Sequence, residues 1–249
     1  MDNPVGGVGL LRHITDGSGV GFCYDIDRRL FAGPDDHGPL LVAWDANVLI
    51  DFHTYGEAAI NDEPLRDGLG QHLPARYEAD VRALADLIHL WFIRDIRFVI
   101  LPRGEDELDG SGGESARRNR QSIDGLADAL TFQLEDWGVG EPRFPEPDAP
   151  IDTLGFEAFP SGADRELVAQ AARYSVDVFL TMDRGVLKAR EAIASPLILR
   201  PRELVDRLVD LGIQPFSGGR IDHEDCPYEG ALPAPDMGRW VPLLAALES

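Results

Sequence analysis

The sequence predicts an α/β protein in three layers, α/β/α, in which helices cover both faces of a central and mostly parallel β-sheet. Short apolar runs, such as residues 40–44, alternate along the chain with longer segments in which apolar residues recur at helical spacing. Strands of a parallel sheet are buried on both faces, so they are apolar throughout rather than at every second residue. The alternation of such strands with helices is typical of a parallel sheet that is covered on both sides.

Each expected element follows from one of these two patterns. In chain order they are a strand at 40–44, a helix at 77–94, a strand at 98–101, a helix at 115–136, a helix at 163–174, a strand at 176–181, a helix at 185–193, a strand at 197–199 and a helix at 201–211. Five prolines make 138–160 an extended loop rather than another core element.

The chain divides into three parts around these elements. Residues 1–39 are rich in Gly and Asp and form an N-terminal extension of irregular structure or a small hairpin. Residues 40–212 form one domain that carries an insert at about 109–160, and residues 213–249 form a C-terminal tail that packs on it. A length of 249 residues suits one enlarged α/β domain.

Composition restricts the setting and the partners. No apolar run approaches the roughly 20 residues of a membrane helix, and no secretory signal opens the chain, so we expect a soluble, cytoplasmic protein without a membrane partner. Cys23 and Cys226 stand far apart and outside any paired motif, so we expect two plain thiols. The net charge of −21 repels polyanions, and a nucleic-acid partner therefore requires local basic patches or bound cations.

Acidic residues stand where the expected strands end. Asp45 follows the first strand, Asp183 follows the strand that ends at Thr181, and Glu107 lies just past the second strand. Asp164 opens the helix that precedes the Asp183 strand, which can bring it near the same edge. Because ligands of open parallel sheets bind beyond the carboxyl ends of the strands, we expect these carboxylates to share one pocket.

Each of these acids also has a structural interpretation. Asp45 could cap the helix that starts at once after it, and Asp164 stands three residues after Ser161, the spacing of a capping box. Asp183 could be a turn residue, and Glu107 could belong to a solvated acidic run. Crowded, buried carboxylates need protonation or a cation, and oxygen ligands select Mg²⁺ or Mn²⁺. A shared pocket would therefore be a metal site.

The two ends of the domain resemble the PIN-domain nucleases. The opening motif is an apolar strand followed by Asp, a small residue, Asn and an aliphatic run, here Leu41 to Trp44 and then Asp45, Ala46, Asn47 and Val48 to Ile50. The closing motif comprises Asp164, Glu166, Leu167, Ala169 and Ala172, then Phe179 to Asp183, and finally Leu199, Arg200, Pro201, Glu203 and Leu204. The resemblance covers about 40–108 and 160–212, and the insert between them has no counterpart.

The resemblance implies a PIN-like fold and a role for each site residue. Asp45, Asp164 and Asp183 would be metal ligands, Asn47 would brace the first loop, and the Thr181 hydroxyl would orient the acids or an attacking water. The family's remaining acid normally follows the second strand as Glu before Leu, which Glu107 and Leu108 match. Because Gly104 and the Gly-rich break at 110–113 disturb this position, Glu105 or Asp106 remains an alternative.

The implied activity is hydrolysis of phosphodiester bonds by a Mg²⁺- or Mn²⁺-dependent endoribonuclease, with single-stranded or structured RNA as the partner. Phosphate contacts could come from Arg117, Arg118 and Arg120, or from Arg184, Lys188 and Arg190. The alternative for these cations is that they pair with nearby acids on solvated surfaces.

Other readings stay open beside this one. The chain could be a non-catalytic PIN-like interaction or scaffold module. A phosphatase of the haloacid dehalogenase type also uses Asp after its first strand, but it usually has a second Asp where this chain has Asn47. Within the nuclease hypothesis, a role as a toxin with an antitoxin partner, a processing enzyme or a defence effector is open, and so is a homodimer.

Overall fold

Four parallel strands form one sheet in the order β2-β1-β3-β4. The computed structural model describes residues 21–22, 30, 38–101, 114–131, 152–216, 228–230, 235 and 237–248, and of 114–120 the backbone alone. The strands are β1 (Leu40–Trp44), β2 (Ile96–Ile100), β3 (Val178–Leu180) and β4 (Leu197–Leu199). The first strand in sequence is therefore central, so the residue that follows it stands between two neighbouring strand ends.

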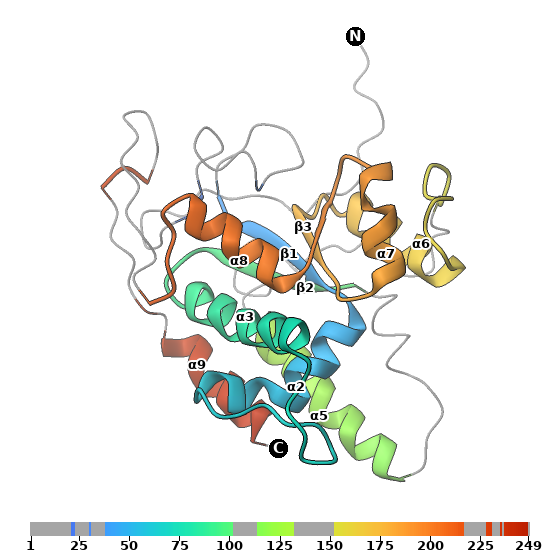
Figure 1. Ribbon diagram of the computed structural model, residues 1–249. Coiled ribbons are helices and arrows are strands. Elements are labelled where there is room, and N and C mark those ends of the chain that lie inside the picture. Colours follow the sequence, from blue (N-terminus) through green and yellow to red (C-terminus); the bar gives the residue numbers. More distant parts are fainter. Residues whose placement is uncertain are drawn as a thin grey trace.

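Helices cover both faces of the sheet, which confirms the predicted three-layer α/β/α architecture (Figure 1). Side chains of β1 alternate between the two cores, since Val42 and Trp44 face one and Ala43 faces the other. On the Trp44 side lie α2 (Ala46–Ile60), α3 (Ala75–Trp91), α5 (Glu114–Thr131), α8 (Pro201–Asp210) and α9 (Met237–Leu247); on the Ala43 side lie α6 (Gly162–Arg173) and α7 (Arg184–Ala189).

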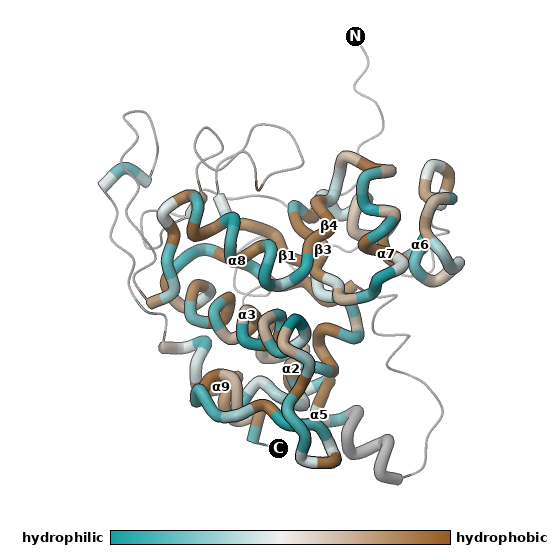
Figure 2. The backbone as a smooth tube through the Cα atoms, in the orientation of Figure 1, coloured by the Kyte–Doolittle hydropathy of each residue, from teal (hydrophilic) through white to brown (hydrophobic). Residues whose placement is uncertain are grey.

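The strands and helices expected from the sequence are present within the described residues, with ends that differ by a few positions. The expected helix at 185–193 is too long, because α7 ends at Ala189 and a single 3₁₀ turn, η2 (Arg190–Ala192), follows it. Residues 152–160 contain turns only, in agreement with the expected loop. Figure 2 shows the strands mostly in brown, the hydrophobic end of its scale, as strands buried on both faces should be.

Two of the helices on the Trp44 side, α2 and α9, are not among the elements expected from the sequence. Helix α2 begins directly after Asp45 and buries Val48, Leu49 and Phe52. Helix α9 lies near the end of the chain and buries Leu243, which belongs to the same core as Trp44. The tail therefore contributes apolar surface to the core, and α2 extends from the carboxyl end of the central strand.

Some sequence expectations fall on residues that the structure does not describe. Cys23, Cys226 and residues 109–113 and 132–151 of the insert belong to this group. In the N-terminal extension, Phe22 forms an isolated antiparallel bridge with Gly38, and its ring is fully buried. Among the described residues, none of the helices combines the length and the apolar character needed to cross a bilayer.

Candidate active site

Asp45 and Thr181 meet at the carboxyl ends of two neighbouring strands. The register pairs Trp44 of β1 with Leu180 of β3, so the next residue of each strand stands side by side. The Thr181 hydroxyl donates a hydrogen bond of 2.6 Å to Asp45 Oδ2. Thr181 is fully buried and Asp45 is 5% exposed. The fold thus joins the opening and closing motifs of the sequence, 136 residues apart, through one buried contact.

The carboxylate of Asp45 does not cap the helix that follows it. Asp45 occupies the N-cap position of α2, but its side chain accepts no capping hydrogen bond from that helix. Its backbone N–H instead donates to the Leu180 carbonyl at 3.0 Å, as part of the sheet. The capping interpretation is therefore wrong for this side chain, whose Oδ2 is held by Thr181. The partial positive charge at the start of α2 favours a carboxylate beside it.

Asp183 is tied to the same hydroxyl and also caps a helix. Its backbone N–H donates to Thr181 Oγ1 at 3.0 Å. Its Oδ1 accepts from the backbone N–H groups of Gly185 at 2.6 Å and Val186 at 2.9 Å, which caps α7. The structural role of Asp183 is thus a helix cap rather than the expected turn residue. Among the described residues no donor reaches Asp183 Oδ2, and the side chain is exposed, so this second oxygen is available to a ligand.

Asp164 also caps a helix with one carboxylate oxygen, while no described donor reaches its other oxygen. It forms the capping box predicted from its spacing to Ser161, because its Oδ2 accepts from the Ser161 N–H at 3.0 Å while its own N–H donates to Ser161 Oγ at 3.0 Å. No donor within the described part of the chain reaches Asp164 Oδ1. A hydrogen bond to one carboxylate oxygen orients the other, so capping and metal binding are compatible at both residues.

The starts of α6 and α7 lie against each other. A Cβ added to Gly185 would stand 2.9 Å from Cγ of Pro160, so only a residue without a side chain allows this approach. Pro160 directly precedes the Ser161 cap of α6, and Gly185 follows the Asp183 cap of α7. Asp164 and Asp183 therefore belong to two adjacent helix starts.

The oxygen atoms at this edge suit a hard divalent ion as ligands, although the described residues supply too few of them. The side chains named above offer carboxylate or hydroxyl oxygens, which Mg²⁺ and Mn²⁺ prefer. Across the described ranges, no group of three or more His, Cys, Asp and Glu side chains stands close enough to hold a metal ion. The expected acid after β2, whether Glu105, Asp106 or Glu107, lies outside the described residues.

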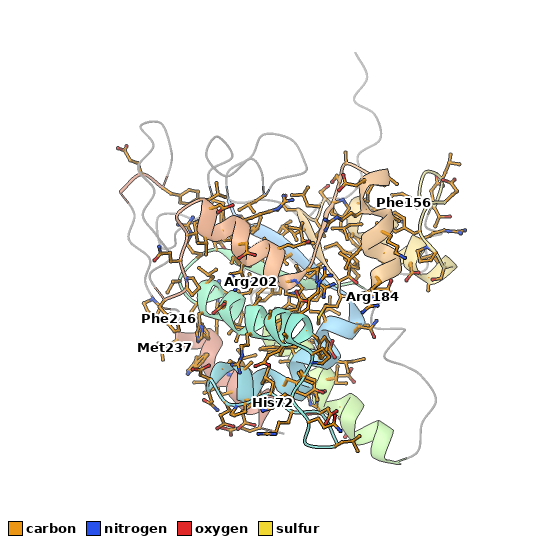
Figure 3. All side chains as sticks on the ribbon, viewed as in Figure 1. His72, Phe156, Arg184, Arg202, Phe216 and Met237 are labelled. Carbon is orange, nitrogen blue, oxygen red and sulfur yellow. The ribbon has the colours of Figure 1, made fainter. Side chains whose placement is uncertain are left out.

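The expected phosphate-binding cations fall into three groups. Arg184 and Lys188 of α7 are exposed, and neither forms an ion pair with a described residue. Figure 3 shows Arg184 at the start of α7, on the side nearest α2. Arg190 instead forms an ion pair with Glu203 at 2.7 Å, which agrees with the alternative that these cations pair with nearby acids. Arg117, Arg118 and Arg120 lie on α5, but their side chains are not described. Asn47 is exposed in the first turn of α2.

Two side-chain bonds hold α2 to its neighbours and so fix the helix that starts at Asp45. The Tyr77 hydroxyl of α3 donates to Asp51 Oδ1, and His53 Nε2 lies 2.6 Å from Ser122 Oγ of α5. Burial raises the pKa of Asp51, and the Tyr77 hydrogen bond partly offsets this. Burial, together with the bond to Asp51, raises the pKa of Tyr77. Burial also lowers the pKa of His53, so its neutral form is favoured.

An ion pair that the sequence did not reveal stands at the carboxyl end of β4. Asp80 of α3 is 1% exposed and accepts hydrogen bonds from Nε and Nη2 of Arg200, the residue after β4. Its sequence signal is a carboxylate on the apolar face of a helix, where it precedes Leu84 by one turn. The partner could not be found, because 120 residues separate the two.

Comparisons with models of protein families, with curated proteins and with solved structures found no match. The resemblance to PIN-domain nucleases therefore depends on the sequence motifs alone.

Proposed function

We propose that the chain is a metal-dependent endoribonuclease of the PIN type, which hydrolyses phosphodiester bonds at the carboxyl ends of β1 and β3. The observation that supports this most directly is the buried hydrogen bond from Thr181 to Asp45. A parallel sheet does not need a specific hydroxyl and a specific carboxylate after two strands. Their contact at the edge where such folds bind ligands favours a binding role.

In this proposal, each acid contributes an oxygen that the fold already orients. Asp45 is held by Thr181, while Asp164 and Asp183 each use one oxygen to cap a helix and keep the other for Mg²⁺ or Mn²⁺. One acid from Glu105, Asp106 or Glu107 would complete the ligands. The bound ion would lower the pKa of a water and stabilise negative charge on the leaving oxygen.

The charge of the chain sets a condition on RNA binding. A net charge of −21 disfavours the approach of a polyanion, so the substrate must be held by local positive charge. Arg184 and Lys188 offer such charge on α7, next to the Asp183 cap, and neither is neutralised by a described acid. They would contact phosphate oxygens and position the scissile bond.

The test compares Mn²⁺ binding, by calorimetry, with cleavage of single-stranded RNA. We expect the wild type to bind Mn²⁺ and cleave, and Asp45→Asn and Asp183→Asn to lose cleavage by on the order of 100-fold, since even an outer-shell partner of a metal contributes 10- to 100-fold. Asn keeps the oxygen that caps α7, so Asp183→Asn separates metal binding from capping.

The matched control is Asp62→Asn, which removes one carboxylate from a 98% exposed side chain and should leave both measurements unchanged. If the wild type binds no Mn²⁺ and cleaves no more than Asp45→Asn, the nuclease proposal is wrong. The chain would then be better described as a non-catalytic interaction module.

A further inference from the structure

The Asp80–Arg200 ion pair fixes the end of the sheet's edge strand. Asp80 Oδ2 accepts from Arg200 Nε at 2.9 Å and from Nη2, and Asp80 Oδ1 lies 3.4 Å from the backbone nitrogen of Arg202. Figure 3 shows Arg202 between α8 and α3. One buried carboxylate thus holds both the residue that follows β4 and the first turn of α8 against α3.

Stability alone is a poor reason to bury this pair. Removing two charges from water costs about as much as their attraction returns, and well-packed apolar side chains in the same place are often as stable or more so. A guanidinium that donates from both Nε and Nη2 to one carboxylate oxygen, however, fixes the position of that oxygen as an apolar contact would not. The pair is therefore better explained by the position it imposes.

The position of Arg200 affects the candidate site, because Arg200 follows the last residue of β4. Strand β4 has three residues and pairs with β3 on one side only within the described sheet. Its last carbonyl, that of Leu199, accepts a 3.1 Å hydrogen bond from the backbone N–H of Thr181. The Thr181 hydroxyl then holds Asp45 Oδ2. If the end of β4 moved away from β3, Thr181 would lose the bond that fixes its backbone.

A second carboxylate, that of Glu203, holds the backbone of Arg200. Glu203 Oε2 accepts from the backbone N–H of Arg200 at 3.0 Å and from Arg190 Nη1 at 2.7 Å. Acids from two helices thus hold Arg200, Asp80 of α3 through its side chain and Glu203 of α8 through its backbone. A short edge strand would otherwise be the part of this sheet most prone to local opening.

We propose that Arg200 and Asp80 are positioning residues, which keep the Thr181 hydroxyl aligned with Asp45 by holding the end of β4. Their effect on metal binding rests on the proposed function, whereas their effect on Thr181 does not. Neither residue contacts the substrate or the metal in this proposal.

The experiment measures hydrogen exchange of the Thr181 backbone amide by NMR, and Mn²⁺ affinity by calorimetry, in Arg200→Lys. Lysine keeps the charge but loses the two-pronged geometry. We expect exchange at Thr181 to become about tenfold faster and Mn²⁺ binding about tenfold weaker, the lower end for residues that orient metal ligands. Asp80→Glu, which keeps both charges but displaces the carboxylate, carries the same expectation if Arg200→Lys does not fold.

The matched control is Arg97→Lys, because Arg97 and Asp95 form a buried ion pair at the opposite end of the sheet. It should lose stability without faster exchange at Thr181 beyond what its global stability accounts for, and without weaker Mn²⁺ binding. Equal exchange at Thr181 in the two variants, after the change in global stability of each is subtracted, would overturn the positioning role. If the wild type binds no Mn²⁺, the nuclease proposal fails, and exchange at Thr181 by itself decides whether the pair positions that residue.

Discussion

At each end of the sheet, a side-chain hydrogen bond joins the chain at β1 to the chain at β3, and the two bonds require different residues. At the amino ends, the backbone N–H of Leu41 in β1 donates to Asp177 Oδ2 at 2.9 Å. At the carboxyl ends, the Thr181 hydroxyl donates to Asp45 Oδ2 at 2.6 Å. Both bonds join the chain around β1 to the chain around β3. The first uses a donor that any residue except proline would supply, whereas the second needs two particular side chains.

The surroundings of the two bonds differ in the same sense. Next to the amino-end bond, Asp95 is paired with the Arg97 guanidinium at 2.8 Å, so a carboxylate is balanced by a cation within the fold. Next to the carboxyl-end bond, Asp183 and Arg184 are exposed. Buried charge at the amino end therefore completes the structure, while charge at the carboxyl end also faces outward, where a ligand can reach it.

The largest expected effect on stability is at the amino end. Asp95→Ala would leave the Arg97 guanidinium without this carboxylate, and breaking a buried ion pair costs about 3–5 kcal/mol. Urea denaturation measures the loss of unfolding free energy. Asp62→Asn is the control, because it removes the charge of the 98% exposed partner of Arg82, keeps a residue that tolerates the positive φ of 55° at this position, and should cost less than about 1 kcal/mol. A similar small loss in both variants would contradict a structural role for the Asp95 pair.

The next effect concerns the carboxyl end. Thr181→Val keeps the shape of the side chain but removes both the donor to Asp45 and the acceptor for the Asp183 N–H, and a hydrogen bond to a charged group alone contributes about 1.5–3 kcal/mol. Thr181→Ser keeps the hydroxyl and should recover most of the loss. Denaturation in the presence of a chelator measures the bond without any metal. If Val and Ser are equally stable, the hydroxyl does not hold Asp45 in solution.

A smaller effect separates the two roles of Asp183. Asp183→Ala removes the cap of α7 and should cost about 1 kcal/mol, whereas Asp183→Asn keeps an acceptor for Gly185 and Val186 and should cost little. Thermal unfolding compares the two variants with the wild type. An equal loss in both would mean that the negative charge, rather than the acceptor oxygen, stabilises the start of α7.

Sequence patterns predicted the sheet well because each strand carries its own signal. An apolar run such as residues 40–44 is recognisable without its neighbours, and an acid directly after it is placed at the sheet edge by topology alone. The capping box of Ser161 and Asp164 was equally readable, since its spacing is local, whereas the same reasoning failed for the side chain of Asp45. These predictions succeeded where cause and effect lie within a few residues of each other.

The remaining features depend on contacts between distant residues or conflict with local preference. The Asp80–Arg200 pair has no local signal that names the partner. Helix α9 contains Pro242 and follows a Gly- and Pro-rich stretch, so its sequence argues against a helix, and packing of residues such as Leu243 into the core outweighs that preference. The extent of α2 was missed because polar residues such as Asp51 and His53 weaken its apolar pattern, while their bonds to α3 and α5 stabilise it.

The smallest expected effect is a pH dependence that acts through α2, the helix that starts at the carboxyl end of the sheet. Burial lowers the pKa of His53 below its usual 6.5, so the unfolded chain binds a proton more readily than the folded one. Its contribution to stability is therefore complete above about pH 6.5 and is lost as the pH falls towards the folded pKa.

His53→Gln keeps a donor for Ser122 Oγ but does not titrate, and it should lose less thermal stability than the wild type between about pH 7.5 and pH 5.5. His72→Gln, at an exposed histidine in a surface turn, is the control and should leave the wild-type slope unchanged. Parallel slopes for His53→Gln and the wild type would show that the link between α2 and α5 does not sense protonation.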